Sequence, residues 1–214
     1  MGSDANGTSA DGTINWNWAH SWNISGTVGG SEYDFKSTAM HELLHSFGIL
    51  SYVGASGTNT GTNWTTFDQF LTTNAGAGSP LINQTTFAWI GPDSVLTGGG
   101  TPPSYAANGM FFSGSNAMAA NSNNPVPIYS PSTWEGGSSG SHTADNYFTG
   151  SNQLMMNAAT SFGPGIRTLS AIEMGMLTDM GYTLTAVPEP STYALILGLG
   201  ALGALVVRRQ RRGC

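Results

Sequence analysis

Two histidines and a glutamate near residue 41 have the spacing of a metal-dependent hydrolase site. His41 and His45 are the two ends of a His-Glu-Leu-Leu-His stretch. Residues four apart on a helix share a face, so both imidazoles can reach one metal ion. Glu42 then lies toward the open side of that ion, where its carboxylate can take the proton of an attacking water molecule. The pattern predicts metal-assisted hydrolysis of a peptide bond, with Glu42 as the general base.

The alternative interpretation of this pattern is a polar helix face that binds no metal. The chain has four histidines, His20, His41, His45 and His142, and two of them make the motif. This concentration of a scarce residue type favours the metal site.

The residues around the motif predict a helix over 37–48. Asp34 or Ser37 suits its N-cap, because a short side chain with an oxygen can accept from the free N–H groups of the first turn. Gly48 suits a left-handed residue at the C-terminal end. Apolar residues at helical spacing should face the core, and these are Met40, Leu43, Leu44 and Phe47.

An alternating segment precedes this helix. Apolar and polar residues alternate over 13–24, which predicts a strand with one buried face. His20 lies on the tryptophan side of that strand, so we expect it to be semi-buried and hydrogen-bonded and not to bind metal. The edge of this strand is a candidate for adding a substrate peptide as a further strand.

The region after the motif is predicted to consist of long polar loops attached to a core. Residues 52–142 are rich in Gly, Ser, Asn and Thr. Three apolar islands in this region are expected to form short strands or turns, at 67–71, 110–112 and 126–129. A second helix is predicted over 168–181, where Ser170 and Glu173 fit a capping box. Together with the first helix, these elements indicate an α+β fold.

Composition narrows the function classes. Charged residues make up 8% of the 214-residue chain, and four of the six basic residues are Arg208, Arg209, Arg211 and Arg212. The acidic remainder would repel phosphate backbones, which argues against nucleic-acid binding. Cys214 is the single cysteine, so an internal disulfide framework and a cysteine-based zinc site are excluded. A bound metal must use histidine and carboxylate ligands.

A catalytic zinc ion normally has three protein ligands and one open position, so a third ligand is needed. In the pattern H-E-x-x-H-x-x-G-x-x-H the third histidine falls at position 51, which is a serine here. Glu173 is the later helical glutamate, but its capping box already uses it. His142, the one histidine after the motif, is the preferred candidate. Asp145 either orients His142 or binds the metal itself.

The body resembles leishmanolysin-like and related bacterial zinc peptidases of the metzincin type. The matching segments are 38–48, 136–145, 153–157 and 169–182. The resemblance implies a zincin-like domain that binds Zn²⁺ through His41, His45 and His142. It also implies Glu42 as the base and Met155 as the methionine of a turn beneath the metal, with Met156 as the other candidate.

The C-terminal segment 187–214 has three parts: a Pro-Glu-Pro turn, an uncharged run over 191–207, and an arginine cluster. The run is at the short end of what a membrane-spanning helix needs, and the arginines favour a cytoplasmic end. This ending resembles the PEP-CTERM sorting signal of Gram-negative bacteria. The resemblance implies export, transient anchoring in the inner membrane, cleavage by an exosortase-type enzyme and release toward the cell surface.

The sequence thus predicts a zincin-like domain over 1–186 and a sorting tail over 187–214. Residues 1–8 have no basic start and no apolar stretch, so we expect an N-terminally shortened piece or a misplaced start. The expected activity is that of a zinc-dependent endopeptidase acting on protein or peptide substrates. The alternative function is a non-catalytic cell-surface or matrix protein built on the same scaffold. The oligomeric state stays open.

Overall fold

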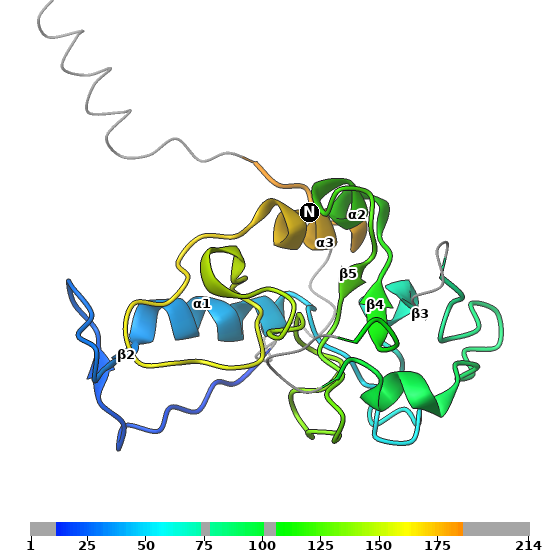
Figure 1. The fold of residues 1–214 in the computed structure, drawn as a ribbon, viewed down its shortest axis with the longest axis horizontal. Coiled ribbons are helices and arrows are strands. Elements are labelled where there is room, and N and C mark those ends of the chain that lie inside the picture. The colour runs from blue at the N-terminus through cyan, green and yellow to red at the C-terminus, as the bar shows by residue number, and fades with distance from the viewer. Residues whose placement is uncertain (1–11, 74–77, 101–105, 186–214) are drawn as a thin grey trace, which may run out of the picture. The chain divides into compact units, whose positions relative to one another are not determined.

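The computed structural model describes residues 12–73, 78–100 and 106–185. The chain divides into two compact units, Met1–Tyr182 and Thr183–Cys214. The predicted boundary between 186 and 187 lies outside the described residues. The first unit contains every helix and strand named below (Figure 1).

The described part of the first unit mixes helices with short strands, which agrees with the α+β prediction. The α-helices are α1 (Phe35–Ser46), α2 (Ser115–Ala120) and α3 (Ala171–Asp179). The 3₁₀ turns are η1 (Asp68–Phe70), η2 (Asp93–Thr97) and η3 (Gly150–Asn152). The strands are β1 (Trp22–Asn23), β2 (Tyr33–Asp34), β3 (Leu71–Thr73), β4 (Met110–Phe112) and β5 (Val126–Pro127).

The three predicted apolar islands contribute to the three-stranded sheet, although the first does so only through Leu71. Its strand order is β3-β4-β5, with both pairs antiparallel. Phe112 lies opposite Leu71 on one side and Val126 on the other. All three side chains are fully buried, and Phe67 packs its ring on that of Phe112 with centroids 5.0 Å apart. The prediction that these islands attach the polar loops to a core is confirmed.

Helix α1 begins and ends two residues earlier than the predicted range of 37–48, and the predicted end residues Asp34 and Gly48 are both used. Its N-cap is Asp34, whose carboxylate accepts from the Ser37 backbone N–H at 3.1 Å. The same carboxylate forms an ion pair with Arg167 at 2.7 Å, which ties the start of α1 to the segment before α3. Beyond the C-terminal end, Gly48 takes a φ of 98°, where a side chain would be strained.

The predicted apolar stripe of α1 is only half right. Leu44 is buried and Met40 packs against the core, but Leu43 is 48% exposed and Phe47 is 50% exposed. His41 is buried in their place. The periodicity rule treats a histidine as polar and turns it outward, whereas this helix buries the histidine and leaves the two apolar side chains facing solvent.

The strand predicted over 13–24 is wrong for most of its length. Within the described chain only Trp22–Asn23 forms a strand there, paired in parallel with Tyr33–Asp34. Trp18 is 65% exposed and Ile24 is 73% exposed. The expectation that His20 is semi-buried is also wrong, because His20 is exposed. The alternation does not form a sheet face because the aromatic rings pack on one another, as in the Trp16–Phe35 contact at 4.6 Å.

Helix α3 is confirmed with its capping box. The Ser170 side chain accepts from the Glu173 backbone N–H, and the Glu173 carboxylate accepts from the Ser170 N–H. The helix packs on α2 (Figure 1). A Cβ on Gly175 would come within 2.6 Å of the Ala117 backbone, so this glycine permits the close approach of the two helices.

Candidate metal centre

Two histidines of α1 meet a third histidine from a distant part of the sequence. One nitrogen from each of His41, His45 and His142 lies within 4.8 Å of the corresponding nitrogens of the other two. The Nε2 atoms of His41 and His142 are 3.1 Å apart. That is close to the separation of two nitrogens that each lie about 2.0–2.1 Å from a shared ion. The structure therefore brings the three predicted ligands to one point.

The other nitrogen of each ring is held by a backbone carbonyl. Nδ1 of His41 lies 2.7 Å from the Met155 oxygen, and Nδ1 of His45 lies 2.7 Å from the Ile49 oxygen. Nδ1 of His142 lies 2.8 Å from the Ser138 oxygen. Because a carbonyl oxygen can only accept, each Nδ1 carries the proton and donates it. A neutral ring with its proton on Nδ1 has its lone pair on Nε2, and the Nε2 atoms of His41 and His142 face each other.

This arrangement fits a bound cation. The Nε2 atoms of His41 and His142 face each other at hydrogen-bond distance, although in the neutral rings both are acceptors. Two lone pairs at that distance repel unless a positive charge lies between or beside them. Carbonyl-fixed imidazoles with free Nε2 atoms are the usual form of histidine ligands to zinc.

Burial favours the neutral form of the His45 and His142 rings. Desolvation, with a smaller contribution from the neighbouring histidines, lowers the pKa of His142 to about 4. Desolvation also lowers the pKa of His45. A metal ligand must be deprotonated at the coordinating nitrogen, so these shifts favour the metal-binding form of both rings at neutral pH.

The turn after α1 explains how His45 acquires its partner. The left-handed Gly48 reverses the chain, and the Ile49 N–H then donates to the Leu44 carbonyl at 3.1 Å. This turn places the Ile49 carbonyl beside the His45 ring. The glycine three residues after His45 therefore has a direct part in orienting that ring.

His142 is held by the sheet. Its carbonyl accepts from the Tyr129 N–H at 2.8 Å, and Thr143 bridges Ile128 in the antiparallel sense. The segment therefore pairs with the two residues that follow β5. Gly140 takes a φ of 84°, so the chain turns just before the ligand, and its N–H donates to the Tyr129 carbonyl.

The predicted methionine turn lies between His41 and α3. Residues 154–157 form a turn closed by the Asn157 N–H and the Leu154 carbonyl, and both Met155 and Met156 are buried. Met155 supplies the carbonyl that binds the His41 ring. The Met156 N–H donates at 2.8 Å to Glu173, whose carboxylate is fully buried. Sequence reasoning missed this second use of Glu173, because a capping box gives no sign of a distant partner.

The remaining candidates occupy other places. Among the described residues, the cluster of possible metal ligands consists of the three histidines, and it includes neither Asp145 nor Glu173. Ser51, at the position where a third histidine is common, is buried and hydrogen-bonded to Asp68. Glu42 is half-buried on α1, between the two histidines in sequence.

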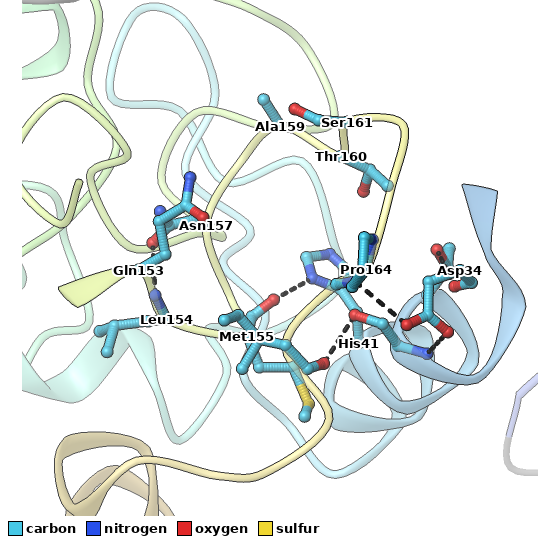
Figure 2. Close-up of a pocket in the computed structure, with 14 residues that line it drawn as sticks. Asp34, His41, Gln153, Leu154, Met155, Asn157, Ala159, Thr160, Ser161 and Pro164 are labelled. Carbon is cyan, nitrogen blue, oxygen red and sulfur yellow. Dashed lines mark hydrogen bonds between the residues drawn. The ribbon is translucent and has the colours of Figure 1, made fainter. Parts of the chain in front are cut away.

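A small cavity of about 80 Å³ lies beside His41 (Figure 2). It is lined by residues of the N-terminal half of α1 and of the segment 153–166, among them Ser37, Thr38 and Thr160. In Figure 2 the His41 ring points to the Met155 carbonyl at one side of this cavity.

The comparison with protein families identifies the C-terminal tail. Residues 186–212 match the PEP-CTERM protein-sorting motif. The predicted sorting signal is confirmed. The motif implies export, sorting to the cell surface and recognition by an exosortase-type enzyme. The chain shows no significant match to a curated protein or to a solved structure.

The membrane-spanning run predicted over 191–207 lies outside the described residues. In the ranges that the structure does describe, no helix has the length and apolar character needed to cross a bilayer.

Proposed function

We propose that the chain is an exported zinc-dependent endopeptidase. The observation that carries the proposal is the convergence of one nitrogen from each of three histidines whose Nδ1 atoms each donate to a backbone carbonyl. A ring fixed in this way presents a lone pair in one direction. Three histidine ligands leave a fourth position open, which is the arrangement of a catalytic zinc site and not of a closed structural one.

The residues of the chain divide the chemistry between them. A zinc ion bound by His41, His45 and His142 supplies the Lewis acidity that polarises a carbonyl group and acidifies water. Glu42 accepts the proton of the attacking water and later gives it to the leaving amine.

The C-terminal tail accounts for how the chain would reach the cell surface. We infer that residues 191–207 anchor the exported chain transiently in the inner membrane, with the arginines on the cytoplasmic side. Cleavage near Pro188-Glu189-Pro190 by an exosortase-type enzyme then releases the body toward the cell surface. The match to the sorting motif over 186–212 supports this order of events.

Metal analysis of the purified chain tests the function. We expect about one zinc ion per chain, together with hydrolysis of casein that is lost on treatment with a chelator and recovered on addition of zinc. Elemental analysis and a peptide-release assay give the two measurements. A chain that folds, binds no zinc and releases no peptides would instead be the non-catalytic surface protein, for which the sorting motif is the favouring observation.

Removal of the tail is expected to abolish membrane association and leave the zinc content unchanged. The reason is that the uncharged run and its arginines lie after Ala186, whereas the three histidines lie before it. Both forms, fused to a working signal peptide in a host with the sorting enzyme, are compared by fractionation. The full chain should appear first in the inner membrane and then as a shorter released form. An identical distribution of the two forms would refute the sorting role of the tail.

A further inference from the structure

A buried carboxylate outside the histidine cluster has no basic partner among the described residues. Asp68 is 0% exposed, and the ion pair found in the described chain joins Asp34 and Arg167 instead. Desolvation raises its pKa. A buried carboxylate without a cation is costly unless hydrogen-bond donors surround it. The hydrogen-bond donors around Asp68 therefore indicate which part of the chain this carboxylate stabilises.

The donors to Asp68 either belong to the segment that follows α1 or are hydrogen-bonded to it. The Ser51 hydroxyl donates to Oδ1 of Asp68 at 2.6 Å, and the Tyr52 N–H donates to Oδ2 at 3.1 Å. The Thr65 N–H also donates to Oδ2, at 2.9 Å. The hydroxyl of Thr65 donates to the Leu50 carbonyl at 2.7 Å. Asp68 and Thr65 thus fix residues 50–52 from one side.

This fixed segment is linked through neighbouring residues to two of the three histidines. Ile49, immediately before it, supplies the carbonyl that binds the His45 ring. The Ser51 N–H donates at 3.0 Å to the hydroxyl of Ser141, the residue next to His142. The Ser141 N–H in turn donates to the Ser138 carbonyl, which also accepts from the His142 ring. A shift of residues 49–52 therefore changes the surroundings of both rings.

We propose that Asp68 is a positioning residue for the metal centre, acting through Ser51 on the Ile49 carbonyl that orients His45 and on the Ser141 segment that carries His142. This inference rests on the proposed zinc site. It assigns a role to the serine that replaces the third histidine of the shorter pattern. Ser51 is not a metal ligand in this arrangement. It connects the buried Asp68 carboxylate to the loop that carries His142.

Zinc affinity of the full chain and its variants tests the role of Asp68. Affinity is measured by competition with a chelator at a temperature where circular dichroism shows each variant folded. Asp68→Asn is expected to weaken zinc binding by about 10–100-fold, as loss of groups that orient metal ligands generally does. The absorption spectrum of the cobalt(II)-substituted chain should change as well, because it reports ligand geometry.

Two further variants separate positioning from general destabilisation. Asp179 is a matched control, since its carboxylate accepts from the Asn116 and Ala117 N–H groups at the start of α2. Asp179→Asn should lower the melting temperature but leave zinc affinity and the cobalt spectrum unchanged. Ser141→Ala removes one hydroxyl between Ser51 and the His142 segment and should weaken zinc binding without unfolding the chain. If Asp68→Asn does not fold, the zinc affinity of Ser141→Ala tests the positioning role instead.

The outcomes distinguish this inference from the proposed function. A parent chain that binds no zinc overturns the proposed function and the inference with it. A parent that binds zinc, with a folded Asp68→Asn or Ser141→Ala variant of equal affinity and identical cobalt spectrum, overturns the positioning role alone. Weakened binding in Asp179→Asn to the same extent would also overturn it, because the effect would then follow stability.

Discussion

Glu42→Gln is expected to retain zinc and to lose peptide hydrolysis by about 100- to 10,000-fold, the usual contribution of a general base. Glutamine keeps the size and polarity of the side chain, and its amide cannot accept the proton of the attacking water. The three histidines are unchanged, so metal content should match that of the parent. The measurements are zinc per chain by elemental analysis and the rate of casein hydrolysis.

Glu32→Gln is the matched control for this substitution. Glu32 lies in the loop before β2, where its carboxylate accepts from the Gly29 N–H and from the Asn23 amide. The same chemical change at that place should leave zinc content and hydrolysis rate at parental values. Near-normal turnover by Glu42→Gln would show that another group acts as the base. Loss of zinc in that variant would mean that Glu42 supports the site structurally.

Local signals in the sequence were sufficient for the helix that carries the motif. The N-cap at Asp34 and the left-handed Gly48 depend on residues close in the chain, and both are present. The capping box of α3 is local in the same sense. Such features can be read from sequence because the hydrogen bonds involved join residues only a few positions apart.

Long-range features could not be predicted in this way. The hydrogen bond from Ser51 to Asp68 spans 17 positions, and the link from Ser51 to Ser141 spans 90. No spacing rule connects such residues. The strand predicted over 13–24 was wrong for a related reason. A strand needs a hydrogen-bonded partner, and in the described chain this segment pairs only with the two residues of β2.

The convergence of the histidines combines both kinds of information. The pair on α1 follows from helical spacing, but position 142 was selected by scarcity, as the one histidine after the motif. The structure places it by pairing residues 142–143 with residues 128–129, next to a strand that the apolar pattern did predict. The backbone carbonyls that orient the three rings had no sequence signal, because every residue has one.

His142→Ala is expected to weaken zinc binding by more than the roughly 10–100-fold cost of losing a group that only orients a ligand. The substitution removes one of three ligands and the lone pair that faces His41 at 3.1 Å. Two histidines four apart on α1 would then hold the ion with solvent in place of the third nitrogen. Chelator competition measures the affinity, and peptide hydrolysis should fall with it at limiting zinc.

His20→Ala and Asp145→Asn complete this experiment as controls. His20 is exposed, with its ring 5.5 Å from that of Tyr33, so its removal should leave zinc affinity unchanged. Asp145, three residues after His142, is the competing ligand that the sequence suggested. If Asp145→Asn loses zinc while a folded His142→Ala retains it, the third ligand is the carboxylate. If His142→Ala loses zinc while Asp145→Asn retains it, the third ligand is the His142 imidazole.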